Sequence, residues 1–184
     1  AELVTQPLYD TDTMADNATS VVFFDGTNLS GDRALSNLDQ AGSLPHPKFH
    51  RIGGVRVVIG PVIVSGELAT DVNQVEDVTR ILFFSAFSLV IGSLKPYLEV
   101  PAFFLPAGLG VVYRGGDTAA YSVNNGQEIF GSFLKLRHWI SLPPLQSFRC
   151  RLDVSTTLDA GGITLNNTQR IWIFLDGENG REVM

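Results

Sequence analysis

The 184-residue sequence predicts an all-β domain of antiparallel strands, and three observations carry this prediction. Residues 148–154 alternate between apolar and polar side chains, which is typical of a strand with one buried face and one solvated face. Pro143 and Pro144 precede this stretch and cannot donate to a strand ladder, so they mark a corner. Further strand-like runs recur without the regular helices of an α/β fold. These features favour a β-sandwich or barrel.

Apolar, β-branched and aromatic runs give the expected elements in chain order. Strands are predicted near residues 18–24, 49–64, 82–91, 95–112, 129–140, 148–154 and 169–175, with a break at Gly60-Pro61 and two short strands within 95–112. Gly53-Gly54 and Gly60 suggest bulges or bends within the strand at 49–64. One short helix is predicted at about 71–80, because Asp71 and Gln74 form a capping-box-like start and Val75 and Val78 follow at helical spacing. Long loops rich in Gly, Asn and Asp are expected at 27–47 and 113–127.

The chain length fits a single domain, which we expect to span residues 18–184. Residues 1–17 are polar, acidic and without periodicity, so they predict an extended N-terminal arm that is loose or ordered only against a neighbour. Charged residues make up 17% of the chain, below the usual value of about 25%. Either a large core or coverage of the surface by partner subunits explains so low a charge content.

The net charge of −6 and the pI near 4.9 argue against nucleic-acid binding as the main task, since phosphate neutralisation needs clustered basic side chains. The one cluster of basic residues consists of Lys135, Arg137, Arg149 and Arg151. Basic residues are ordinary on the solvated faces of strands, so this cluster does not indicate nucleic-acid binding. The longest apolar run, residues 81–92, is too short for the roughly 20 residues that cross a bilayer. Cys150 is the single cysteine and falls on the apolar face of its strand, which predicts a buried, unreactive thiol.

Val21 to Asn28 is the stretch most like an enzyme motif. A strand that ends in Asp25-Gly-Thr resembles the phosphotransfer loop of the haloacid dehalogenase-like hydrolases. That family places a nucleophilic aspartate two positions earlier, where this chain has Phe23, and no periodic helix follows. Asp-Gly after a strand is also an ordinary turn. We therefore expect a turn here, and a hydrolase centred on Asp25 is the less favoured hypothesis.

The three histidines give no catalytic or metal-binding pattern. His46 and His50 have the spacing of a helical zinc pair, but Pro47 lies between them and no third ligand is evident. His138 lies in a predicted strand without a triad context. The sequence thus predicts a protein that is not an enzyme, with no catalytic residue, no cofactor and no metal.

A binding module is the alternative function. The two long loops contain carboxylates and amides that are suited to calcium or to sugar hydroxyls. These are Asp25, Asn28, Asp32, Asp117, Asn124 and Asn125. A lectin-like or receptor-binding β-sandwich would use them.

The order of features also resembles a known family. An extended segment and a strand are followed by a loop holding Asn37-Leu-Asp-Gln-Ala-Gly-Ser-Leu-Pro45, a strand with an inserted helix, and proline-cornered strands such as ISLPPLQSFRCRLDV. Over about residues 18–176 this pattern is similar to the single-jelly-roll capsid proteins of tailless icosahedral bacteriophages, many of which enclose a membrane. The resemblance implies an eight-stranded jelly roll without catalytic residues.

The same resemblance implies a structural role. Such a protein self-assembles, or assembles with a sister capsid protein, into an icosahedral virion shell in the host cytoplasm, in some cases over a viral membrane. It binds neither nucleic acid nor a small-molecule substrate directly. The solvated face of the strand at 148–154, with Arg149, Arg151 and Asp153, is the surface that we expect to contact a neighbour.

Overall fold

The computed structural model describes residues 2–27, 32–61, 72–92, 96–105, 134–158 and 161–181. Nearly all of its regular structure in these ranges is strand. The elements are, in chain order, β1 (Glu2–Thr5), β2 (Leu8–Met14), β3 (Ser20–Phe23), β4 (Lys48–Pro61), α1 (Val72–Phe84), β5 (Ser85–Ile91), β6 (Pro96–Pro101), the 3₁₀ helix η1 (Ala102–Phe104), β7 (Leu134–Leu142), β8 (Phe148–Val154) and β9 (Gln169–Arg181).

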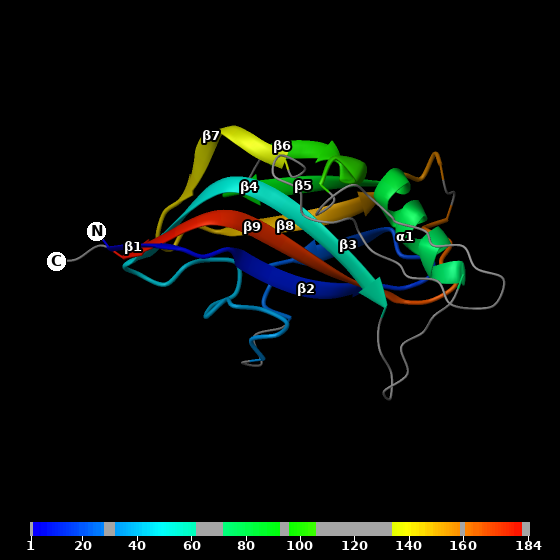
Figure 1. The fold of residues 1–184 in the computed structure, drawn as a ribbon, viewed down its shortest axis with the longest axis horizontal. Coiled ribbons are helices and arrows are strands. Elements are labelled where there is room, and N and C mark those ends of the chain that lie inside the picture. Colours follow the sequence, from blue (N-terminus) through cyan, green and yellow to red (C-terminus); the bar gives the residue numbers. More distant parts are fainter. Residues whose placement is uncertain are drawn as a thin grey trace.

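The described strands form two antiparallel sheets (Figure 1). One sheet has the order β1–β9–β4–β7, and the other has the order β3–β8–β5–β6. β2 also pairs with β9, so β1 and β2 lie end to end along one edge of that long strand. If β1 and β2 count as one interrupted strand, the sheets contain strands 1-8-3-6 and 2-7-4-5 of the chain. This is the double Greek-key order of a jelly-roll sandwich, and it confirms the predicted all-β fold.

The core lies between the two sheets. Side chains on the facing sides are fully buried, and they include Phe23, Phe87, Leu89, Leu152, Val55, Val57, Ile171, Ile173 and Leu175. β8 alternates between buried and more exposed residues along its whole length, as its sequence predicted. Each fully buried Val, Leu, Ile or Phe stabilises the fold by roughly 1.5–3 kcal/mol. Apolar burial between the sheets therefore holds the sandwich together.

The helix is longer than predicted. α1 runs to Phe84, whereas the sequence predicted a helix at 71–80 and a strand from residue 82; residue 71 lies outside the described ranges. The reason is that Val78, Ile81 and Leu82 keep the helical spacing, and all three are buried against the sandwich. α1 lies at the end of the molecule opposite to β1 and the two termini (Figure 1).

The N-terminal residues are extended, as predicted, but they are not an arm that is loose or ordered only by a neighbour. β1 and β2 pair with β9 of the same chain. In β2 the inward positions include Leu8, Asp10 and Met14, which are all buried. The buried aspartate among them interrupts the two-residue alternation of apolar side chains, so hydropathy alone does not indicate this strand.

Two other segments differ in detail from the prediction. β4 continues through Gly60 to Pro61 as one strand, without the break predicted there, and it has the bulge predicted at Gly53-Gly54, where the register shifts between Ile52 and Gly54. β6 is followed by a 3₁₀ turn, where the sequence predicted a second short strand; residues 106–112 of that prediction lie outside the described part. The loop expected at 113–127 and the start of the strand expected at 129–140 also lie outside it.

Candidate binding groove

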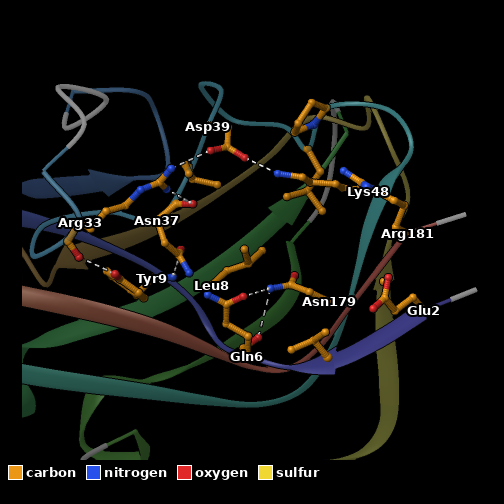
Figure 2. A pocket seen from close by; sticks show the side chains of 15 residues that line it. Glu2, Gln6, Leu8, Tyr9, Arg33, Asn37, Asp39, Lys48, Asn179 and Arg181 are labelled. Atoms are coloured by element: carbon orange, nitrogen blue, oxygen red, sulfur yellow. Dashed lines mark hydrogen bonds and ion pairs between the residues drawn. The ribbon is translucent and has the colours of Figure 1, made fainter.

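A groove of about 560 Å³ opens at the end of the sandwich where the termini lie (Figure 2). It lies between the first sheet, at β1, β9 and the start of β4, and the loop over residues 33–45. Its apolar lining consists of Val4, Leu8, Leu38, Leu44 and Pro45. Its charged lining consists of Glu2, Arg33, Asp39, Lys48 and Arg181. This mixture of apolar and charged groups suits a partner that carries both kinds of side chain.

Strand register places three of these charges in one row. Arg181 of β9 is opposite Glu2 of β1 on one side and opposite Lys48 of β4 on the other. Adjacent strands lie about 4.8 Å apart, so these side chains are neighbours across the sheet. No sequence motif indicates this row, because its members come from the two ends of the chain and from the start of β4.

Asp39 pairs with Arg33 of the same loop and with Lys48 at the start of β4. Its Oδ1 lies 3.0 Å from Arg33 Nη2, and its Oδ2 lies 2.5 Å from Lys48 Nζ (Figure 2). The hydrogen bonds from Lys48 and from Arg33 hold the pKa of the Asp39 carboxyl below its usual value. All three side chains are well exposed, so their contribution to stability is small. Their effect is to fix the charge pattern along one side of the groove.

Asn37 keeps the long loop in place. Its Oδ1 accepts from the backbone N–H of Tyr9 (2.9 Å), and its Nδ2 donates to the carbonyl of Pro7 (2.7 Å). Its own N–H donates to the carbonyl of Tyr9 (3.2 Å). The asparagine thereby satisfies backbone groups on the outer edge of β2, as a neighbouring strand would. Asn37 therefore holds its part of the loop against β2 at Pro7 and Tyr9.

Asn179 connects the groove to a buried histidine. Its Nδ2 lies 3.4 Å from both the carbonyl and the Oε1 of Gln6 (Figure 2). Its Oδ1 lies 2.8 Å from His50 Nδ1. His50 Nε2 lies 3.1 Å from the carbonyl of Leu175. His50 is fully buried, and this burial lowers its pKa, although hydrogen bonds to Asn179 and Leu175 oppose the shift.

His46 and His50, which have the spacing of a helical zinc pair, lie in different surroundings. His46 is exposed in the loop, whereas both ring nitrogens of His50 are occupied by protein oxygens. His138 is exposed on β7. Among the described residues, no group of three or more His, Cys, Asp or Glu is placed to hold a metal ion.

The loop carboxylates of the binding-module hypothesis are engaged in their own turns. Asp25 Oδ1 accepts from the N–H (2.9 Å) and the hydroxyl (2.7 Å) of Thr27, and Gly26 has a φ of 97°. Asp32 Oδ1 accepts from the N–H of Ala34 at 2.9 Å. Both are Asx-type turns. Asn28, Asp117, Asn124 and Asn125 lie outside the described residues.

The predicted basic group is divided between the two sheets. Lys135 and Arg137 are exposed on β7, whereas Arg149 and Arg151 project outward from β8. Arg151 pairs with Asp153 on the same strand at 2.6 Å. Cys150 is buried and free, and burial raises the pKa of its thiol well above the usual value, with a smaller effect from Asp10. The thiol is therefore protonated and inaccessible, as predicted.

An exposed aromatic cluster is the feature that the sequence did not reveal. Phe83 of α1 and Phe103 and Phe104 of η1 are 59%, 42% and 55% exposed. The Phe83 and Phe103 rings are stacked with centroids 5.5 Å apart, and Phe103 and Phe104 are 5.0 Å apart. In a strand, neighbouring aromatics point to opposite faces, but the 3₁₀ turn directs Phe103 and Phe104 to the same surface. We call these three residues the aromatic cluster.

A search against protein-family models finds no match, and no curated protein sequence is similar to this chain. Among the described residues, no helix has both the length and the apolar character needed to cross a membrane.

Proposed function

We propose that this protein is a non-enzymatic subunit of a capsid-type shell, which associates with copies of itself or with a sister shell protein. The observation that carries this proposal is the aromatic cluster. Three phenylalanine rings pack on one another while about half of each side chain faces solvent. Contiguous exposed apolar surface on a folded domain is typical of an interaction site, and aromatic side chains dominate the energy of many interfaces.

The position of the apolar surface supports lateral association. The aromatic cluster lies beside α1, at one end of the sandwich, whereas exposed Leu3 and Val4 lie on β1 at the other end (Figure 1). A subunit that presents apolar surface at two opposite ends can contact a different copy at each end, so association can continue from copy to copy into rings or closed shells. The jelly-roll order of the sheets fits such a role, since this architecture is common in capsid proteins.

The proposal includes a location and a set of partners. The protein would assemble in the host cytoplasm and reside in the virion of a tailless icosahedral bacteriophage, with copies of itself or a sister protein on either side and a viral membrane beneath where one is present. The net charge of −6 suits a shell subunit better than a nucleic-acid-binding one.

Sedimentation velocity over a wide concentration range tests the proposal. We expect the wild-type protein to associate, and we expect the triple variant Phe83→Ser/Phe103→Ser/Phe104→Ser to need at least a tenfold higher concentration for the same association. Leu145→Asn is the matched control: Leu145 is 66% exposed at the Pro143-Pro144 corner, its N–H donates to the carbonyl of Leu44 at the groove, and its positive φ suits asparagine. Strictly monomeric wild-type protein, absent from purified particles, would overturn the proposal.

The groove favours a second candidate function, a β-sandwich binding module. Its apolar and charged linings could recognise a sugar or an acidic peptide. Under this hypothesis, a glycan or peptide panel, or calcium, raises the melting temperature in a saturable way, and Lys48→Ala removes the effect of an acidic ligand. A saturable shift in monomeric protein would favour this candidate over the shell subunit.

A further inference from the structure

We infer that β1 is an exchange strand: when two copies associate, β1 of each copy leaves its own β9 and takes the same place on β9 of the partner copy. This inference rests on the proposed function, because it specifies how two copies are joined. It concerns residues Glu2–Thr5 as the moving element, Gln6-Pro7 as the hinge, and residues 178–181 of β9 as the acceptor.

The first argument is that β1 contributes little to the fold. All four of its residues are exposed, and none belongs to the hydrophobic core. Leu3 and Val4 are 49% and 52% exposed, so two apolar side chains remain largely in water while the strand is in place. The release of β1 would cost four register pairs with β9, the 3.4 Å contacts between Asn179 and Gln6, and the partial burial of Leu3 and Val4. Elements of this kind have the lowest local stability in a protein.

The groove explains why β1 is so poorly packed. Glu2 and Val4 of β1 line the groove, and so does Gln6, directly after the strand. Figure 2 shows Glu2 and Gln6 in this lining. β2 differs, although it lies on the same edge of β9: Leu8 and Met14 are buried in the core, and Asn37 covers its outer edge. The boundary between a firmly held strand and a weakly held one therefore falls at Gln6-Pro7.

The hinge separates the strand that moves from the strand that stays. Pro7 has no N–H to donate to a ladder, and its carbonyl accepts from Asn37 Nδ2 (2.7 Å), so Pro7 stays with β2. The residue before a proline favours extended conformations, which keeps β1 in line with β2 along β9 in the closed chain. Gln6 is held by its N–H to the carbonyl of Gly177 (3.2 Å) and by Asn179 Nδ2 (3.4 Å). The change of chain direction in the exchange therefore falls at Gln6, and these bonds re-form on the partner copy together with the β1 ladder.

The acceptor edge is complementary to the strand. In the register of β1 on β9, Glu2 is opposite Arg181 and Thr5 is opposite Glu178, so no two like charges face each other. An exchanged strand restores the same four pairs on the partner copy. The exchange thus costs no strand pairing in total, and it brings the two groove ends together, where new contacts form.

Disulfide trapping tests the inference. Glu2 and Arg181 are both exposed, so Glu2→Cys and Arg181→Cys should leave the fold intact. The two single variants are mixed and incubated under mild oxidation at a concentration where the protein associates. The yield of disulfide-linked dimer should be at least ten times higher in this mixture than with Glu2→Cys alone. Wild-type protein is the background control, because its one cysteine, Cys150, is buried.

The competing arrangement is tested in the same experiment. If two β1 strands instead paired edge to edge about a two-fold axis, Leu3 would face Val4 of the other copy, and a mixture of Glu2→Cys with Thr5→Cys would cross-link. That result, or no excess cross-linking of Glu2→Cys with Arg181→Cys, would overturn the exchange.

Sedimentation of the cross-linked sample separates this inference from the proposed function. Association without a cross-link between residues 2 and 181 would support the shell proposal and contradict the exchange of β1. Cross-linked dimers that do not associate further would support the exchange and contradict the shell proposal.

Discussion

Three buried polar side chains, Asp10, His50 and Asp77, tie separate parts of the sandwich together. Asp77 of α1 accepts from the backbone N–H groups of Asn166 (2.8 Å) and Asn167 (2.9 Å), so it fixes the helix to the segment before β9. Asp10 does the same between β2 and β3, and His50 does so between β4 and β9. A buried polar group that is fully bonded specifies one arrangement, because any other leaves it unpaired.

Asp10 offers the first prediction. Its Oδ2 accepts from the N–H of Phe24, a buried residue with a left-handed backbone (φ 64°), and burial is the main cause that raises the pKa of this carboxyl. Asp10→Ala leaves that N–H buried without a partner, which should lower the free energy of unfolding by about 1–3 kcal/mol. Asp10→Asn keeps an acceptor oxygen without the buried charge, so its loss should be less than half as large. Urea unfolding at pH 7 measures both, and equal losses would contradict this role of Asp10.

His50 gives a prediction on pH. Because burial lowers its pKa in the folded protein, the unfolded chain binds the proton more readily. The free energy of unfolding should therefore be highest above the ordinary histidine value of about 6.5, and it should fall as the pH drops through that value toward the lowered pKa. His50→Gln should remove this decrease in the free energy of unfolding between about pH 7.5 and 5. His138 is exposed on β7, so His138→Gln should leave the decrease in place. Urea unfolding at a series of pH values measures the slope, and an unchanged slope in His50→Gln would refute the prediction.

At the scale of elements, β9 organises the first sheet. It pairs with β4 along its whole length and with both β1 and β2 on its other edge. The bulge at Gly53 shifts the register by one residue and brings Gly177 against the backbone of β4. The geometry of the groove depends on this shift, since Asn179 and Arg181 follow Gly177 on the same strand.

Gly177 should not tolerate a side chain. A Cβ there would lie 1.8 Å from the carbonyl oxygen of Arg51, which is backbone and cannot rotate away. We expect Gly177→Ala to lower the free energy of unfolding by about 3 kcal/mol or more. Gly60→Ala on β4 is the control, because its Cβ would make an ordinary contact with the Trp172 ring (3.4 Å); its effect should stay within about 1 kcal/mol. Comparable midpoints of chemical unfolding for the two variants would contradict this role of Gly177.

The sequence-based predictions were accurate for some elements and wrong for others. Residues 148–154 were predicted well, since a clean two-residue alternation is typical of a half-buried strand and of few other structures. β2 was missed because Asp10 occupies an inward position, and the end of α1 was missed because Phe83 and Phe84 favour strands on propensity alone. In both cases packing against the sandwich outweighed the local signal.

At the scale of the whole molecule, the fold class followed from pattern, but the groove and the aromatic cluster did not. The groove brings together residues from both ends of the chain and from the loop after β3, so its composition depends on strand register. The aromatic cluster depends on a 3₁₀ turn that places two adjacent rings on one side. Neither arrangement has a sequence motif, because each is a product of tertiary structure.

Net charge gives the last prediction. Each copy carries a formal charge of −6 at pH 7, so copies repel one another, while the contact proposed here is made by uncharged rings. Salt screens the repulsion: the Debye length falls from about 20 Å near 20 mM to about 6 Å near 300 mM. We therefore expect the association constant to rise several-fold over this range, and to rise again as the pH is lowered toward the pI near 4.9.

Sedimentation equilibrium at several salt concentrations measures this effect. The variant Phe83→Ser/Phe103→Ser/Phe104→Ser keeps the same net charge and should stay weakly associated at every salt concentration, because screening removes a repulsion but supplies no attraction. Association that weakens as salt is added would mean that ion pairs hold the copies together. In that case the outward charges of β8, Arg149, Arg151 and Asp153, would replace the aromatic cluster as the surface of contact, because opposite charges across an interface lose their attraction when screened.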